Sequence, residues 1–182
     1  MSPAAYSVLT AIGPDRVGIV EDLAELVAAR DGNIEDSRMA VLGGEFAAIM
    51  LVAMPEGGLD DLEAALDRLG QGAGLRLELK RTTRHQAVAE GRPYLLETVS
   101  LDTPGIVKAV TSMLKRHRIN IENLETETRP APMTGAPIFH MRATVILDAG
   151  VSVSTLRLEL ADLEADRGWD ISLKPLLPGR PE

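Results

Sequence analysis

The segment DRVGIV at residues 15–20 recurs as DTPGIV at residues 102–107, and in both places the tripeptide NIE follows downstream. A shift of 87 residues aligns residues 15–38 with residues 102–125 without a gap, and seven of these 24 pairs are identical. Unrelated segments of this length share far fewer residues. The chain therefore contains an internal repeat, and any assignment of the fold has to start from it.

Hydrophobic periodicity predicts the same elements in the same order in each copy. In the first copy we expect a strand, a helix, two strands joined by a Gly-Gly turn, a helix and a strand, at residues 6–12, 17–30, 33–42, 45–54, 59–69 and 75–79. The second copy repeats this order at residues 94–101, 104–116, 120–128, 138–147, 153–165 and 169–173, with six residues inserted around RPAPMTGAP, between its second and third strands.

The order βαββαβ, present twice, predicts an α+β chain of two ferredoxin-like units in tandem. Each unit should be a four-stranded antiparallel sheet with its helices on one face. We expect domains at residues 1–82 and 93–182, joined by a polar linker at residues 83–92.

Composition narrows the possible functions. The chain has 27 acidic and 19 basic residues, a net charge of −8 and 3% aromatic residues, which disfavours direct binding to nucleic acid. It has no cysteine, which excludes thiolate chemistry and cysteine-ligated metal. It shows neither a signal peptide nor an apolar stretch of membrane-spanning length, so we expect a cytoplasmic protein without a membrane partner.

The loop that contains the recurring motif is the candidate binding element. Asp15 and either Asp102 or Thr103 are suited to cap the following helix, and Pro104 suits its first turn. A glycine there allows another group to approach the free N–H donors of the helix, which attract an anion such as a carboxylate. The alternative is that the aspartate only caps and the glycine only packs.

The paired motifs, Asp-x-x-Gly-Ile-Val followed by Asn-Ile-Glu, resemble those of tandem ACT domains. The chain is most similar to the glycine cleavage system transcriptional repressor family, over about residues 6–174. This resemblance implies a regulatory protein that binds a small ligand, commonly an amino acid, where the loop of one copy faces the second strand of its partner. The implied ligand-binding residues are Asp15, Gly18, Ile19, Asn33 and Ile34 in the first copy, and Asp102, Gly105, Ile106, Asn120 and Ile121 in the second.

In that resemblance the aspartates hold the amino group, the Gly-Ile main chain donates to the carboxylate, and the Asn-Ile pairs form the opposite strand edge. The first copy departs from the pattern because it has Arg16-Val17 where many ACT loops have a proline before the glycine. Arg16 could add a partner for the carboxylate, or the first site could be altered. The insertion leaves the geometry beside the second copy's second strand open.

Two other classes of function are less favoured. The three histidines, His85, His117 and His140, have no partner at ligand spacing, so we expect no metal, no cofactor and no enzyme. The basic runs at residues 80–85 and 115–118 fit a linker and a helix end better than a phosphate-binding surface.

The leading hypothesis is an amino-acid-sensing regulator that acts on transcription or metabolism through a protein partner, such as a transcription regulator. The alternative is a ligand-free interaction module that uses its sheets for assembly. We expect a homodimer, and the alternative is a monomer whose own two copies form the pair.

Overall fold

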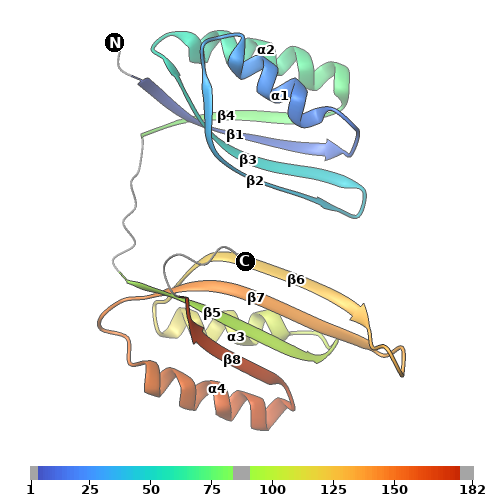
Figure 1. Cartoon of the computed structure of the whole chain (residues 1–182), viewed down its shortest axis with the longest axis vertical. Helices are drawn as coiled ribbons and strands as arrows, with labels where there is room; N and C mark the ends of the chain where they lie inside the picture. Colours follow the sequence, from blue (N-terminus) through green and yellow to red (C-terminus); the bar gives the residue numbers. More distant parts are fainter. Residues whose placement is uncertain (1–3, 84–90, 177–182) are drawn as a thin grey trace. The chain divides into compact units, whose positions relative to one another are not determined.

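The computed structural model describes residues 4–83 and 91–176 (Figure 1). The chain divides into two compact units, Met1–Gln86 and Ala87–Glu182, here called unit 1 and unit 2. Most of the expected linker lies outside the described residues, and its last residue, Arg92, already belongs to a strand.

Unit 1 is a four-stranded antiparallel sheet whose two helices lie on one face (Figure 1). The strand order across the sheet is β2-β3-β1-β4, so β2 and β4 are its edges. The elements are β1 (Ala4–Pro14), α1 (Ile19–Ala28), β2 (Asn33–Leu42), β3 (Glu45–Pro55), α2 (Gly58–Ala73) and β4 (Arg76–Thr82).

Unit 2 repeats this architecture, with strand order β6-β7-β5-β8. Its elements are β5 (Arg92–Leu101), α3 (Ile106–Arg116), β6 (Asn120–Pro130), β7 (Pro137–Leu147), α4 (Val153–Arg167) and β8 (Asp170–Pro175). The predicted fold, βαββαβ twice, is confirmed. Among the described residues, no helix is both long enough and apolar enough to cross a membrane.

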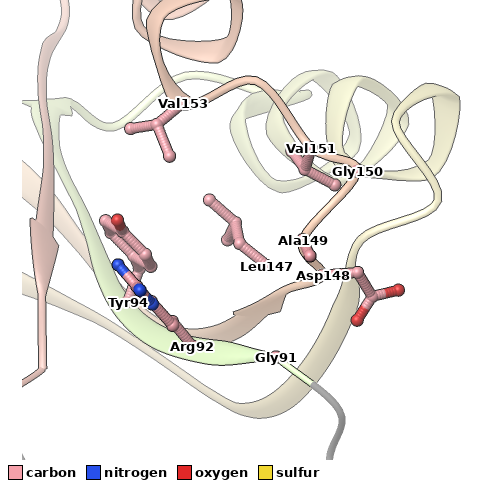
Figure 2. A pocket seen from close by; sticks show the side chains of 9 residues that line it. All are labelled: Gly91, Arg92, Tyr94, Leu147, Asp148, Ala149, Gly150, Val151 and Val153. Atoms are coloured by element: carbon pink, nitrogen blue, oxygen red, sulfur yellow. The ribbon is translucent and has the colours of Figure 1, made fainter.

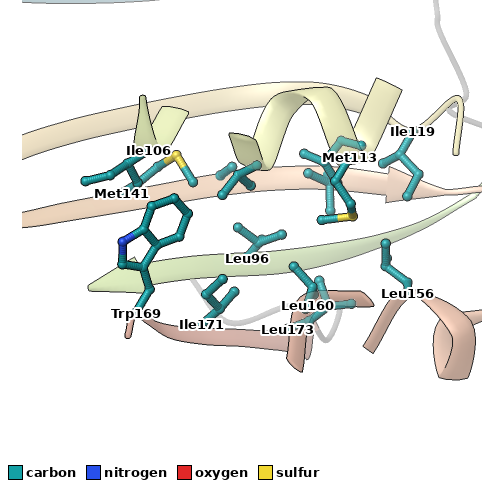
Figure 3. Packing of buried hydrophobic residues seen from close by; sticks show 14 of the residues in the cluster. Leu96, Ile106, Met113, Ile119, Met141, Leu156, Leu160, Trp169, Ile171 and Leu173 are labelled. Atoms are coloured by element: carbon teal, nitrogen blue, oxygen red, sulfur yellow. The ribbon is translucent and has the colours of Figure 1, made fainter. Parts of the chain in front are cut away.

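Each unit has its own hydrophobic core between the sheet and its helices. Alternate residues of the central strands point into it, because successive side chains of a strand face opposite sides. The first helical residues of the two motifs, Ile19 and Ile106, are each 2% exposed. Figure 3 shows Ile106 beside Met141 and Trp169 at one end of the unit 2 core. The recurring isoleucine is therefore a packing residue.

The recurring NIE tripeptide opens the first edge strand of each unit and contains a β-bulge. Strand pairing skips Glu35 in β2 and Glu122 in β6, at equivalent places in the two registers. A bulge bends an edge strand and increases its twist. Part of the sequence repeat therefore encodes backbone geometry.

The insertion in unit 2 lengthens a hairpin and leaves the sheet register intact. In unit 1 the turn between β2 and β3 is Gly43-Gly44, with both residues at positive φ. In unit 2 the strands continue to a Pro130–Pro137 pair and close through a loop in which the Ala131 N–H donates to the Ala136 carbonyl at 2.8 Å.

Candidate ligand-binding loops

The loop between the first strand and the first helix has the same anchor in both units. The Asp15 N–H donates to the Gly44 carbonyl at 3.0 Å, and the Asp102 N–H donates to the Pro137 carbonyl at 2.9 Å. Both acceptors belong to the neighbouring hairpin. From the sequence, the geometry beside the insertion was undetermined. The structure shows that the insertion preserves the anchor of the second loop.

The helix caps differ from the expectation. The N-cap residues are Gly18 and Gly105, at φ of 92° and 99°, and within the described part of the chain neither helix receives a side-chain cap. The expectation that Asp15 and either Asp102 or Thr103 cap these helices is wrong, as is the placement of Pro104 in the first turn. The chain enters each helix through a left-handed residue, a conformation that glycine adopts without a Cβ penalty.

Each loop therefore presents uncapped backbone donors beside open space. The first N–H groups of a helix have no partner within the helix, and here they include those of Ile19 and Ile106. Around the position that a Cβ would take on Gly105, no described atom lies within 4 Å, and on Gly18 the nearest is an Arg16 nitrogen at 3.8 Å. A ligand carboxylate could approach these donors.

The two aspartate side chains lie exposed beside these donors. The Asp102 carboxylate accepts one long hydrogen bond, from the Thr128 hydroxyl of β6 at 3.4 Å. The Asp15 carboxylate has no hydrogen-bond partner among the described residues. Both carboxylates are thus available to accept hydrogen bonds from an ammonium group.

Charge distinguishes the two helix N-termini. The first turn of α1 carries Glu21 and Asp22, and the Arg16 guanidinium pairs with the Asp22 carboxylate at 2.5 Å. Arg16 is therefore engaged within its own loop. At the position of Glu21, the first turn of α3 has Lys108. An anion at α3 would meet a cation, whereas an anion at α1 would meet a carboxylate.

The predicted strand-edge residues do not join the loop of their own unit. Asn33 pairs with Ala53, whose partner in β1 is Tyr6, at the other end of the sheet from Asp15. Asn120 pairs with Ile146, whose partner in β5 is Pro93, and so lies equally far from Asp102.

The side chains of Ile34 and Ile121 pack against the cores of their units. Only their backbone groups and the exposed asparagines can therefore face a ligand.

The two described histidines lie in different places in unit 2. The ring of His117 lies 2.9 Å from Glu159, and this hydrogen bond, together with Arg116, holds the pKa of the Glu159 carboxyl below its ordinary value. His140 lies on the open face of the unit 2 sheet, and His85 falls outside the described residues. No group of three or more candidate metal ligands occurs in the described ranges.

A hollow of about 890 Å³ in unit 2 was not anticipated from the sequence (Figure 2). Arg92 and Tyr94 form one wall, Leu147 lies at the centre, and Asp148 stands at the rim away from Arg92. It lies where β5 begins, at the other end of that strand from Asp102. The hollow has no counterpart in the repeated motifs, so the loops remain the candidate site.

Comparison with known proteins agrees with this architecture. A family model described as an ACT domain matches residues 5–80. The glycine cleavage system transcriptional repressor of Escherichia coli (strain K12) is 31% identical over 156 residues, which cover 86% of this chain and 82% of that protein.

Two solved structures resemble both units, since each covers 96% of this chain. An unknown protein from Galdieria sulphuraria is 33% identical, with a TM-score of 0.84 and 100% of its chain covered. A provisionally named glycine cleavage system transcriptional repressor is 27% identical, with a TM-score of 0.71 and 99% of its chain covered.

Proposed function

The chain belongs to the family of glycine cleavage system transcriptional repressors, and from this premise we propose that it senses a small amino acid and regulates through a protein partner. The observation that carries the proposal is the repeated loop. Each loop has an exposed aspartate three residues before the glycine N-cap, and the N–H donors of the helix that follows are left without a side-chain cap. A zwitterion needs these two kinds of group, an acceptor for its ammonium and donors for its carboxylate.

The loop of unit 2 is the stronger of the two candidates. Lys108 adds a positive charge to the donors of α3, whereas Glu21 and Asp22 already supply the negative charge that the α1 terminus attracts. We therefore assign the ligand site to Asp102, Gly105 and the Ile106 N–H. The equivalent groups of unit 1 form a weaker site.

The Asn33-Ile34 and Asn120-Ile121 edges can complete a site only in a neighbouring ACT unit. Each lies far from the loop of its own unit, on an edge strand whose outer backbone groups can pair with another strand. If two such edge strands paired antiparallel about their middles, the first residues of one strand would lie beside the last residues of the other. Those last residues lead into the hairpin that anchors the aspartate loop, so the Asn-Ile pair of one unit would lie near the loop of the next. We propose this as the way in which association and ligand binding are linked.

Regulation through a partner follows from charge. With a net charge of −8, the chain would be repelled by DNA phosphates, so we propose that it acts on a protein that contacts DNA, in the cytoplasm and without catalysing a reaction. A ligand can change that association only by the difference between its affinities for the free and the associated protein.

A ligand-free interaction module is the second candidate, favoured by one observation. The α1 terminus carries Glu21 and Asp22, and Arg16 is engaged with Asp22, so unit 1 is poorly suited to hold an anion. If the loop of unit 2 also bound no ligand, the role that remains for both sheets would be assembly with other proteins or subunits.

Isothermal titration calorimetry of the full chain against glycine, serine and the other small amino acids tests the proposal. We expect saturable binding to at least one of them and its loss in Asp102→Ala, with Asp15→Ala less affected. Asp148→Ala, an exposed aspartate of unit 2 at the far end of β5, is the matched control and should bind like the wild type. Absence of binding by the folded wild-type protein would refute the sensor and leave the interaction module.

A further inference from the structure

The two helices of unit 1 leave one face of its sheet uncovered (Figure 1). The centre of this face is largely apolar. Ile12 is 53% exposed and Ile49 is 51% exposed, in neighbouring rows of the two central strands. We call this surface the apolar face, and its aliphatic residues are Val8, Ile12, Leu42, Ala47, Ile49 and Leu51. Contiguous apolar surface of this kind on a protein exterior marks an interaction site.

Unit 2 shows that the fold does not require an apolar face. In the row that corresponds to Thr10 and Ile49, unit 2 has Glu97 and Arg142, whose charged groups lie 3.5 Å apart. Lys174 from β8 also reaches Glu97, at 3.2 Å. In this fold the central row of the open face can therefore be charged, although Leu95, Val99 and Leu101 keep the open face of unit 2 partly aliphatic. The aliphatic residue at this place in unit 1, Ile49, is not needed for the sheet to form.

The borders of the apolar face carry charges of opposite sign in the same rows. Arg38 on the β2 edge shares a row with Glu78 on the β4 edge, through Ile49 and Thr10 between them. In the next row, through Leu51 and Val8, Asp36 on β2 corresponds to Lys80 on β4. Each of these two rows thus has a cation at one end and an anion at the other, and the order reverses between them. The row through Ala47 and Ile12 ends in Ala40 on β2 and Arg76 on β4.

We propose that the apolar face is a homodimer interface, in which it packs on the apolar face of a second copy of this chain. A two-fold axis parallel to the strands places the β2 edge of one sheet over the β4 edge of the other. Arg38 then faces Glu78 of the partner subunit, and Asp36 faces Lys80 of the partner subunit. Sheets packed in this way lie ~10 Å apart with their strands nearly aligned, and their aliphatic side chains interdigitate.

The charge pattern also indicates which surface packs on the apolar face. A partner surface like the open face of unit 2 would bury charged groups such as Glu97 and Arg142 against aliphatic side chains, and removing ions from water is costly. A second apolar face buries aliphatic side chains at the centre and leaves the charges at the rim. The Asp36 and Arg38 side chains already contact each other at 2.6 Å, but both are mostly exposed, and such pairs are weak enough to rearrange.

Sedimentation of the full chain tests the interface. We expect the wild type to be a dimer or a multiple of one, and Ile49→Arg, at the centre of the face, to halve its mass. Leu158→Arg on α4 is the matched control, because Leu158 is 68% exposed and belongs to a helix of unit 2, and it should keep the wild-type mass. A monomeric wild type, or an Ile49→Arg protein of unchanged mass, would overturn the proposal.

A charge exchange tests the orientation and does not depend on the folding of Ile49→Arg. Arg38→Glu alone and Glu78→Arg alone should each weaken the dimer roughly tenfold, because each places like charges face to face twice. The double variant Arg38→Glu/Glu78→Arg restores opposite charges and should recover the wild-type dissociation constant, as should an equimolar mixture of the two single variants. Failure of both to recover would rule out the arrangement of β2 over β4.

Discussion

At the first turn after the loop, unit 1 carries Glu21 and Asp22, whereas unit 2 carries Lys108 and Ala109. The backbones at these places are alike, with a left-handed glycine N-cap and a hairpin carbonyl that accepts the aspartate N–H. The open faces of the sheets also differ in their central row, which has Ile49 and Thr10 in unit 1 and the charged Arg142 and Glu97 in unit 2. The comparison shows that folding holds the backbone and core of an ACT unit constant, while its surfaces are free to change.

The strongest test of the shared core is to truncate its recurring isoleucine. Ile19→Ala and Ile106→Ala should each destabilise their unit by about 2–5 kcal/mol, because a fully packed side chain leaves a cavity. Urea unfolding followed by circular dichroism measures the loss. Val17→Ala, at a 99% exposed position of the first loop, should change stability little. A large loss in one unit and none in the other would break the equivalence of the two cores.

The shared glycine cap predicts a smaller and equal effect. Gly18→Ala and Gly105→Ala should each lower the free energy of unfolding by about 1–2 kcal/mol, because alanine at positive φ is strained in both loops. Thermal unfolding of the two variants measures this. Apart from the flanking residues, no atom of the described chain lies within 3.4 Å of either added Cβ, so a clash with a more distant segment is not a competing cause. Unequal losses would mean that one loop can relax and the other cannot.

Exchanging the charges of the first turns should exchange the preference between the loops. Lys108→Glu should weaken binding of the amino acid found by calorimetry by about 0.3–1 kcal/mol, and Glu21→Lys should strengthen binding at unit 1 by a similar amount. Titrations in low and high salt should show the difference shrinking as salt rises. Insensitivity of the affinity to both variants would place the ligand away from the helix N-termini.

The smallest effect belongs to an ion pair that we describe in unit 2. The hydrogen bond from His117 lowers the pKa of Glu159 from its ordinary value of 4.5, so the ionised carboxylate stabilises the folded state above that pH. Glu159→Gln should therefore be slightly less stable than the wild type near neutral pH. Its deficit should vanish as the pH falls through the lowered pKa of Glu159. A deficit that persists in acid would point to lost packing.

The repeat and its periodicity predicted all twelve elements of the two units, but not all of their ends. The helix expected at residues 59–69 continues to Ala73 because Gly70 does not end it. A Cβ on Gly70 would stand 2.7 Å from the Leu75 carbonyl, so this glycine allows β4 to begin close to the helix. In the sequence, the same glycine is typical of a helix terminus.

The candidate site was predictable in its residue types and not in its geometry. The recurrence of Asp, Gly and Ile indicated the loop, whereas the cap at Gly105 depends on a backbone angle that no residue pattern specifies. The distance of Asn33 from its own loop follows from strand register. The apolar face required knowledge of which strands are neighbours, since its residues come from β1, β2 and β3.

The hydrogen bonds from Asp15 to Gly44 and from Asp102 to Pro137 give each loop a mechanical role. They tie the segment that would grip a ligand to the tip of the hairpin that carries an edge strand of the sheet. If a ligand displaced the loop, the tip of the hairpin would move with it. The outer strand of that hairpin, β2 or β6, is an edge of its sheet, where another sheet could pair. In each unit a movement of the aspartate loop would therefore be transmitted through the hairpin to the edge of the sheet.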